Sequence, residues 1–223
     1  MSKQIIVAID EYENASFNEI LGALDPNLCM IKIGSVSFNA LGRDVIYSAA
    51  NKGFDIFLDL KLHDIPNTVK KSIEGLANLP INMLTVHISG GKIMLESAME
   101  ALKGTDIKVF GVTALTSLSD IDTNQIYQRT AADQVNKMLD IAEEVKIDGV
   151  VCSPHELELV TARGSLLSIT PGIRLSDVND DQTRIMTPKQ AIDLGANYLV
   201  IGRPITGAED ISEALNMIYQ SIN

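Results

Sequence analysis

The feature that most constrains this chain is a regular alternation of short apolar runs with amphipathic stretches along its whole length. Several of the runs are apolar nearly throughout, as the strands of a parallel sheet are when helices cover both of its faces. Eight runs have this strand-like character, at Gln4–Ile9, Cys29–Ile33, Ile56–Leu60, Met83–Ile88, Ile107–Val112, Gly149–Cys152, Leu166–Ile169 and Tyr198–Ile201. The alternation predicts a parallel α/β fold in which a helix follows each strand.

Two of the predicted helices begin with clear start signals. The segments Ser153–Glu156 and Thr187–Gln190 each place a capping hydroxyl before a proline, with an acid or amide three residues after the cap. Eight such units without a Pro/Gly/Ser-rich linker predict a single (β/α)8 TIM barrel, one domain over residues 1–223. An open doubly wound sheet is the alternative. In a barrel, catalytic groups lie at the carboxyl ends of the strands, and phosphate binds in the loops after strands seven and eight.

The charge balance limits the partners that this chain can have. Of the 223 residues, 18 are Lys or Arg and 29 are Asp or Glu, which gives a net charge of −11. This charge repels a phosphate backbone and an anionic lipid surface, so we expect neither nucleic acid nor membrane as a partner. Cys29 and Cys152 lie within apolar runs, where buried small hydrophobes are a better interpretation than a disulfide or a metal site. No secretory signal is recognisable, and we expect a cytoplasmic protein.

The third apolar run ends in the pattern D-x-K-x-x-D, formed by Asp59, Lys61 and Asp64. Residues two apart on a strand point to the same side, so Asp59 and Lys61 would face the barrel interior while Leu60 and Leu62 face the helices. An acid and a base among apolar neighbours must pair, and such pairs mark functional sites more often than they add stability. An ordinary ion pair at a strand end is the alternative.

Further charges stand at the ends of other predicted strands. Asp10 closes the first run, and Lys32 lies between two isoleucines near the end of the second. Alone, each has a simpler explanation, because a terminal Asp can cap a helix and a strand Lys can extend to solvent. Together with the D-x-K-x-x-D pattern, they predict a row of alternating acids and bases at one mouth of the barrel.

The loops after the seventh and eighth runs each pair a glycine with an arginine. Gly172 precedes Arg174, and Gly202 precedes Arg203. Glycine lets a ligand approach the backbone, and arginine grips phosphate through a forked set of donors, so this pairing predicts a phosphate site. Turn glycines with solvated arginines are the alternative. The long polar segment 175–186, which contains Gln182, fits either a ligand-closing lid or a solvated connection.

These residues occur in motifs that resemble the bacterial type of the orotidine 5′-phosphate decarboxylase family, over essentially the whole chain. The motif D-L-K-L-H-D-I-P-N-T is highly specific, whereas the others are individually weak but occur in the family's order. They are V-A-I-D, K-I-G, D-L-K-L-H-D-I-P-N-T, P-G-I-R, D-Q-T-R-I-M-T-P and I-G-R-P-I-T, which begin at residues 7, 32, 59, 171, 181 and 201. The resemblance implies a cofactor-free carboxy-lyase that converts orotidine 5′-phosphate to UMP and CO2, the last step of de novo pyrimidine nucleotide biosynthesis.

The resemblance also implies roles for the residues at the mouth. Asp10 and Lys32 would hold the ribose and join the charge network, Asp59 would lie beside the scissile carboxylate, and Lys61 would donate the proton to C6. Asp64 would complete the catalytic network, but in the active site of a second protomer, which Thr68 would also reach. The expected enzyme is therefore a homodimer.

Other residues are implied in substrate binding. Thr116 and Ser117 correspond to the segment that recognises the pyrimidine, although Ser119 could serve equally. The phosphate ligands correspond to Gln182, Gly202 and Arg203. The residue that helps enclose the substrate corresponds to Arg174.

Two other functions fit parts of the same pattern. A metal-dependent lyase such as a hexulose-phosphate synthase also resembles D-x-K-x-x-D, and Asp59, Asp64, His63 and His87 could then surround Mg²⁺. Because hard Mg²⁺ prefers oxygen to imidazole, ordinary loop and strand-end histidines are the better interpretation, and we expect no metal. The second alternative is a phosphate-binding barrel without catalytic activity.

Overall fold

The computed structural model describes residues 3–174 and 186–223, and its strands form one closed parallel barrel. Each strand pairs with the next in sequence, and the ring closes where Ile5 of the first strand pairs with Leu199 of the last. The strands are β1 (Ile5–Ile9), β2 (Cys29–Gly34), β3 (Ile56–Leu62), β4 (Met83–His87), β5 (Lys108–Val112), β6 (Gly149–Val151), β7 (Leu167–Thr170) and β8 (Tyr198–Ile201). The predicted TIM barrel is confirmed, and the open sheet is wrong because β1 and β8 are hydrogen-bonded neighbours.

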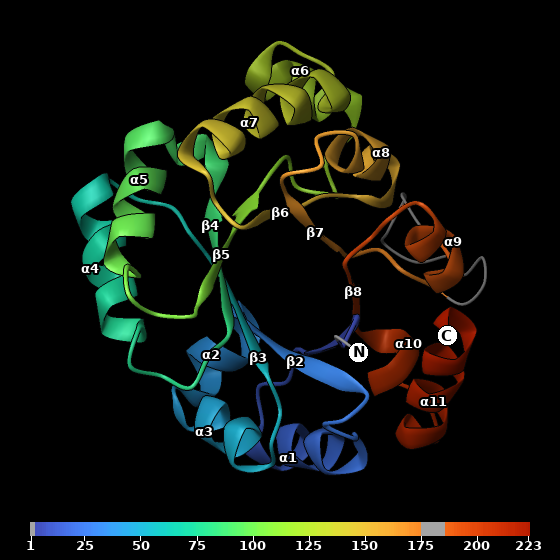
Figure 1. Ribbon diagram of the computed structural model, residues 1–223. Coiled ribbons are helices and arrows are strands. Elements are labelled where there is room, and N and C mark those ends of the chain that lie inside the picture. Colours follow the sequence, from blue (N-terminus) through green and yellow to red (C-terminus); the bar gives the residue numbers. More distant parts are fainter. Residues whose placement is uncertain (1–2, 175–185) are drawn as a thin grey trace.

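Helices surround the barrel as an outer ring (Figure 1). Two helices follow each of β2, β5 and β8. The α-helices are α1 (Asn14–Ala23), α2 (Ser35–Leu41), α3 (Asp44–Asn51), α4 (Pro66–Leu76), α5 (Lys92–Ala101), α6 (Asp120–Tyr127), α7 (Ala131–Val145), α8 (Leu157–Thr161), α9 (Pro188–Asp193), α10 (Arg203–Thr206) and α11 (Ile211–Ile222). Two 3₁₀ turns, η1 (Ile88–Gly90) and η2 (Pro154–Glu156), complete the described secondary structure.

Both predicted helix starts are present. At α9, the Thr187 hydroxyl accepts from the backbone N–H of Gln190, and the Gln190 side chain accepts from the Thr187 N–H in return. At the other start, Ser153 and Glu156 make the same reciprocal cap, but it opens the short turn η2, and α8 follows directly. These caps satisfy backbone donors that would otherwise be unpaired at the helix ends.

The apolar interior is divided into two layers by the alternation of side chains along the strands. Side chains that point outward, such as Ile5, Val7 and Ile9 of β1, pack against the helices. Those that point inward fill the amino-terminal half of the barrel, where the rings of Phe57 and Phe110 meet edge to face with centroids 6.4 Å apart. Each large side chain buried here stabilises the fold by about 1.5–3 kcal/mol.

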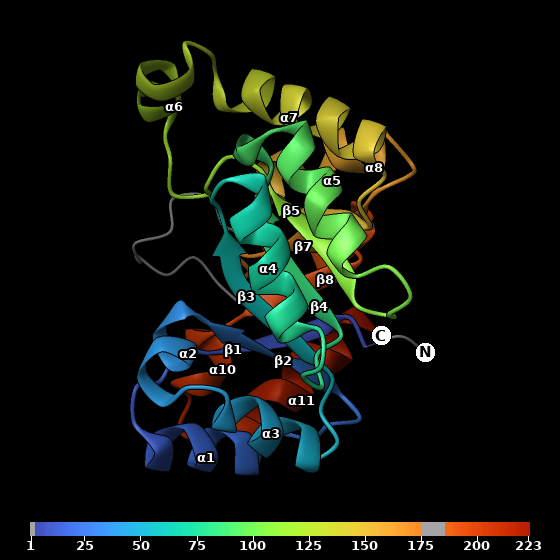
Figure 2. The ribbon, with the colours of Figure 1, turned by 90° about the vertical axis from the view of Figure 1, so that its left-hand side faces the viewer.

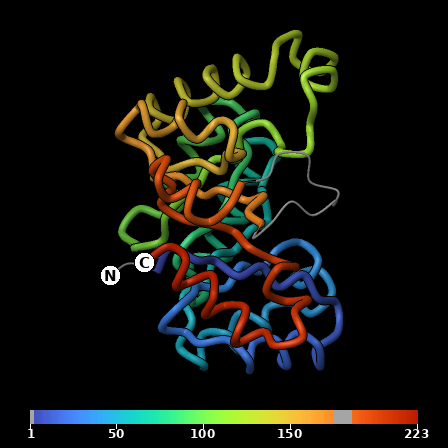
Figure 3. The backbone as a smooth tube through the Cα atoms, turned by 90° about the vertical axis from the view of Figure 1, so that its right-hand side faces the viewer, coloured from blue at the N-terminus to red at the C-terminus, as the bar shows by residue number. Residues whose placement is uncertain are grey.

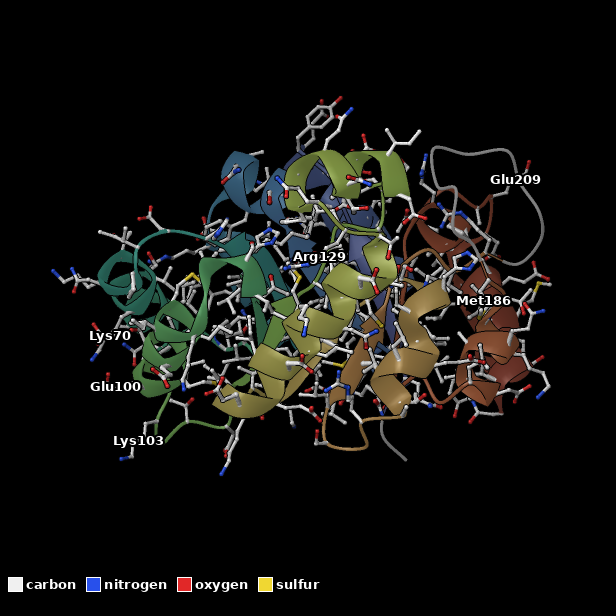
Figure 4. The ribbon with its side chains drawn as sticks, turned by 90° about the horizontal axis from the view of Figure 1, so that it is seen from above. Lys70, Glu100, Lys103, Arg129, Met186 and Glu209 are labelled. Atoms are coloured by element: carbon white, nitrogen blue, oxygen red, sulfur yellow. The ribbon has the colours of Figure 1, made fainter. Side chains whose placement is uncertain are left out.

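The barrel has two distinct ends. Viewed from either side, α6 projects at the end to which the strands run, and the C-terminal end of α11 lies at the other (Figures 2 and 3). On the outer surface α4 and α5 lie side by side, and Lys70 and Glu100 form an ion pair of 3.0 Å between them (Figure 4). We call the end at the carboxyl termini of the strands the mouth, and the apolar inner layer behind it the floor.

Two further observations bear on the sequence predictions. Cys29 and Cys152 are both buried and free, as expected, and burial raises the pKa of each thiol to about 12. Within residues 3–174 and 186–223, no helix combines the length and the apolar character that crossing a bilayer requires.

Candidate active site

A cavity of about 560 Å³ opens at the mouth of the barrel, within the size range of small-molecule sites. Its inner wall is the floor, to which Phe57, Ile169 and Val200 contribute. Its polar wall is formed by side chains at the strand ends and in the loops that follow: Asp10, Glu11, Lys32, Asp59, Lys61, Thr116, Arg174, Arg203 and Thr206. A ligand in this cavity would therefore rest on an apolar base and be held by charges around its edge.

The centre of the polar wall is an ion pair on β3. The Nζ atom of Lys61 lies 2.6 Å from Oδ2 of Asp59. Asp59 is buried, whereas about a third of the Lys61 side chain is exposed, so the ammonium group faces the cavity from a buried support. Leu60 and Leu62 pack outward against the helix layer, as the strand periodicity predicted.

A second lysine extends this pair into a row. Nζ of Lys32, on β2, lies 3.1 Å from Oδ1 of Asp10 and 3.7 Å from Oδ2 of Asp59. Acids and bases therefore alternate in the order Asp10, Lys32, Asp59 and Lys61. Burying charges is costly unless each has a partner of opposite sign, and the alternation supplies one to every member.

Gly34 makes room for this row at the end of β2. A Cβ atom at this position would lie 2.8 Å from Nζ of Lys32 and 3.1 Å from Oδ1 of Asp10. Both distances are shorter than ordinary van der Waals contact, so a larger residue would require these two charged groups to shift. The glycine of the K-I-G motif thus has a steric reason at the site itself.

The backbone of β3 is irregular where it carries Lys61. Between the pairs Leu58↔Leu84 and Leu62↔Val86, β3 advances four residues while β4 advances two. Lys61 takes up the excess in a left-handed conformation with φ 51°, which is uncommon for a residue with a side chain. Its N–H donates to Oγ1 of Thr85, 2.8 Å away on β4. The lysine therefore projects from a bulge.

The opposite side of the mouth is built from the loops after β7 and β8. Gly172 has φ 82°, a left-handed conformation that favours glycine, and this turn leads to Arg174, which is buried in the cavity wall. Gly202 follows β8, and the exposed Arg203 begins the short helix α10. Both glycine–arginine pairs line the cavity, whereas their role in binding phosphate stays a prediction.

Comparisons with known proteins show the family to which this chain belongs. The profile of the Orotidine 5′-phosphate decarboxylase / HUMPS family matches residues 3–218. A curated protein of Saccharophagus degradans named orotidine 5′-phosphate decarboxylase is 46% identical over 221 residues, which cover 96% of this chain and 93% of that protein. A protein of the same name from Actinobacillus pleuropneumoniae serotype 5b is 44% identical over the full length of both chains.

This chain belongs to the orotidine 5′-phosphate decarboxylase / HUMPS family. The resemblance stated from the motifs is confirmed, as is the prediction that the chain is an enzyme of this family. Its fold also matches the crystal structure of orotidine 5′-phosphate decarboxylase from Lactobacillus acidophilus, with a TM-score of 0.87 and 37% sequence identity over 100% of both chains.

Most of the residues that the family resemblance selected lie around this cavity. Eight of them form part of its wall: Asp10, Lys32, Asp59, Lys61, Thr116, Arg174, Gly202 and Arg203. Ser117 is exposed and lies outside the described wall. Ser119 accepts from the N–H of Asp122 and donates to its carboxylate as the cap of α6, so its hydroxyl is already engaged. Gln182 lies outside the described residues.

Two residues selected from the family resemblance stand apart from the charged row. Asp64 and Thr68 are exposed at the start of α4, and Oδ1 of Asp64 accepts from the N–H of Ile65 at 2.6 Å. Among the described residues, no ion pair joins Asp64 to Lys61 of the same chain. Within a single chain, Asp59 of the D-x-K-x-x-D pattern therefore pairs with Lys61, whereas Asp64 faces outward.

Three polar residues at the site were not identified from the sequence. Glu11 and Thr206 line the cavity. Glu11 follows Asp10 directly, and Thr206 lies one turn after Arg203 on α10. Their nearness to predicted site residues could have identified both. Thr85 is fully buried behind the ion pair and bonds to both Asp59 and Lys61. No pattern in the sequence pointed to Thr85, because its contacts depend on the pairing of β3 with β4.

The hypothesis of a Mg²⁺ site depended on Asp59, Asp64, His63 and His87. In the part of the chain that the structure describes, no three His, Cys, Asp or Glu side chains are grouped to hold a metal ion. The two imidazoles instead lie near each other, with ring centroids 5.1 Å apart. Burial, followed by the charges of His63 and Lys61, holds the pKa of His87 below its usual value.

Proposed function

We propose that this chain decarboxylates orotidine 5′-phosphate to UMP and CO2, without a metal or an organic cofactor, as the last step of de novo pyrimidine nucleotide synthesis. The observation that carries this proposal is the row of alternating charges, with Lys32 and Asp59 buried, that ends in Lys61, 2.6 Å from Asp59, at the edge of a cavity. The names of the full-length relatives support the same activity. We expect residues 1–223 to act as one catalytic domain in the cytoplasm.

The chemistry requires stabilisation of negative charge at C6 of the pyrimidine. When the bond between C6 and the carboxylate carbon breaks, CO2 leaves and the electron pair stays on C6, where no cofactor delocalises it. The ammonium group of Lys61 would lie where this charge develops and would then transfer a proton to C6. Solvent returns a proton to the lysine. Asp59 would orient Lys61 and lie beside the departing carboxylate.

One proton donor does not supply the whole acceleration. A positioned general acid contributes about 10²- to 10⁴-fold, which is about 3–5 kcal/mol, whereas large enzymatic accelerations need up to about 23 kcal/mol. The remainder must come from preorganised charge, supplied here by Asp10, Lys32 and Asp59, and from binding energy at the distant phosphate. A rigid, paired row suits this role because it needs little reorganisation during the reaction.

The other side of the mouth is proposed to hold the phosphate. The phosphate would be bound by the Arg203 guanidinium, the Gly202 backbone and Gln182. Arg174 would help enclose the substrate. Both described arginines line the same cavity as Lys61. Thr116, also in the cavity wall, would contact the pyrimidine together with Ser117. Ser119 is a weaker choice because it caps α6.

We also propose that the active enzyme is a homodimer in which Asp64 and Thr68 reach the active site of the partner. Both residues are exposed beside Ile65, which is 66% exposed at the start of α4. Ile93, at the start of the neighbouring helix α5, is 69% exposed. Large exposed apolar side chains at the rim of the mouth favour an interface there.

Mixing two inactive variants tests the shared site. In a dimer that pairs a Lys61→Ala chain with an Asp64→Asn chain, one active site carries both substitutions and the other carries neither. If the variants refold together at random, activity should recover to about a quarter of the wild-type value, as expected for a two-fold symmetric pair. A mixture as inactive as its two components would refute the exchange of Asp64.

The activity itself is tested by following the absorbance of orotidine 5′-phosphate, with and without a chelator. We expect conversion to UMP at an unchanged rate in EDTA. Activity that EDTA abolishes would favour the metal-dependent lyase. Binding of UMP without any change in orotidine 5′-phosphate absorbance would favour a barrel that only binds phosphate.

A further inference from the structure

The hydroxyl group of Thr85 connects the two residues at the centre of the charged row. Thr85 is fully buried on β4. Its Oγ1 accepts from the backbone N–H of Lys61 at 2.8 Å and donates to Oδ1 of Asp59 at 2.9 Å. A threonine hydroxyl has only one proton to donate, so this proton is committed to the Asp59 carboxylate.

The first of these bonds supports the bulge in β3. Where β3 carries two more residues than β4, the regular ladder cannot serve every backbone group of the longer strand. The N–H of Lys61 donates to the Thr85 side chain at this point. A left-handed residue with a side chain persists only where its surroundings fix it, and this hydrogen bond is one of the contacts that fix Lys61.

The second bond sets the rotation of the Asp59 carboxylate. With Oδ1 bonded to Thr85, the other oxygen, Oδ2, faces the lysines, at 2.6 Å from Nζ of Lys61 and 3.7 Å from Nζ of Lys32. The two carboxylate oxygens therefore have separate partners. Thr85 acts from the side that the cavity does not reach, since it is not part of the cavity wall.

We propose that Thr85 is a positioning residue for the decarboxylation, which aligns the Lys61 ammonium with the reacting carbon through both the bulge and the Asp59 carboxylate. This inference rests on the proposed function. It assigns Thr85 no contact with substrate. Its effect should therefore fall on the chemical step and leave binding at the phosphate end of the cavity unchanged.

The test compares Thr85→Val with Thr85→Ser. Valine keeps the shape of threonine but removes the hydroxyl, whereas serine keeps the hydroxyl. We expect Thr85→Val to lower kcat by about 10- to 100-fold, or about 1.4–2.7 kcal/mol at 1.36 kcal/mol per factor of ten, with KM changed by less than about threefold. Thr85→Ser should keep kcat within about threefold of wild type.

Thr113→Val is the matched control. Thr113 is also buried, and its hydroxyl donates to the backbone carbonyl of Val151 at 2.8 Å, away from the charged row. It should lose thermal stability as Thr85→Val does but keep kcat. A loss of kcat at Thr85→Val no larger than at Thr113→Val would overturn the inference, and so would failure of serine to restore kcat. If Thr85→Val does not fold, Thr85→Ala replaces it, because alanine and serine differ only in the hydroxyl group. The kcat of Thr85→Ala should then fall relative to Thr85→Ser by the same factor, about 10- to 100-fold.

These outcomes remain distinct from failure of the proposed function. A wild-type chain that does not turn over orotidine 5′-phosphate would refute the proposed function and, with it, the role of Thr85. An active wild-type chain whose kcat is insensitive to loss of the Thr85 hydroxyl would refute the positioning role alone.

Discussion

The floor and the mouth of this barrel are made by the same inward-facing positions of the same strands, yet their chemistry is opposite. On β3 the inward side chains run from Phe57 at the floor to Asp59 and Lys61 at the mouth. On β2 they run from Met30 to Lys32. The residue type thus switches from apolar to charged within one step of the period-two alternation, and on β3 the backbone itself becomes irregular at Lys61.

This difference separates stability from activity along the barrel axis. The floor removes apolar surface from water, which stabilises the fold by about 25 cal/mol for each Å² buried. At the mouth, buried charges contribute little net stability even when they are paired, because desolvation offsets their attraction. Substitutions at the floor should therefore change the free energy of unfolding, and substitutions at the mouth should change turnover.

The largest expected effect is at the mouth. Lys61→Ala should lower kcat by about 10²- to 10⁴-fold or more, because it would remove both the proposed proton donor and the positive charge proposed to stabilise C6. UMP binding, measured by calorimetry, should persist because the phosphate ligands are untouched. A melting temperature close to that of wild type would show that the charge serves activity, whereas appreciable residual turnover would exclude this lysine as the donor.

At the floor, we expect a substitution to lower stability and to leave turnover unchanged. Phe110 is fully buried and meets both Phe57 and Tyr198 edge to face. Phe110→Ala should lower the free energy of unfolding by about 3–5 kcal/mol through lost burial and the cavity left behind. Urea denaturation measures this loss. Below the unfolding transition, kcat per folded molecule should stay near the wild-type value. A kcat loss as large as that of Lys61→Ala would contradict the separation of stability at the floor from activity at the mouth.

A smaller effect distinguishes the two sides of the mouth. Arg203→Ala should raise KM for orotidine 5′-phosphate by about 10- to 100-fold, since a hydrogen bond to a charged group contributes about 1.5–3 kcal/mol. Steady-state kinetics with orotidine, which lacks the phosphate, provide the control, because the substitution should then have little effect. Equal losses with both substrates would remove Arg203 from the phosphate site.

The smallest effect concerns His87, the half-buried inward-facing residue at the end of β4. Burial is the main cause that lowers its pKa from 6.5, so the folded chain holds it neutral where the unfolded chain becomes protonated. Its contribution to stability is therefore present above pH 6.5 and is lost as the pH falls below that value. Urea midpoints compared between about pH 7.5 and 5.5 should fall more for wild type than for His87→Gln. Parallel pH dependences would contradict this assignment.

Much of the barrel and of the charged row could be predicted because both follow from local periodicity. Alternation within single strands was enough to place Asp59 and Lys61 on one side, and the strand-end positions of Asp10 and Lys32 placed them at the same mouth. The bulge at Lys61 and its bond to Thr85 could not be predicted in this way. They depend on the register between β3 and β4, which joins residues 24 positions apart.

The segment 116–119, which is proposed to contact the pyrimidine, shows a second limit of prediction from sequence. Thr116, Ser117 and Ser119 are chemically similar and close in sequence, so the residue pattern alone could not separate them. The structure distinguishes them by backbone geometry, because Ser119 precedes the first turn of α6 and caps it while Thr116 lines the cavity. Which hydroxyl is available to a ligand thus depended on where a helix begins.

The central claim, that the ammonium of Lys61 delivers the proton to C6, is tested most directly through the reverse of that step. A group that protonates C6 must also remove the C6 hydrogen of bound UMP along the same path, so wild-type enzyme in D2O should exchange this hydrogen for deuterium, as followed by proton NMR. The account predicts exchange by wild type and none above background by a Lys61→Ala variant that still binds UMP. Equal exchange by the two proteins would contradict it.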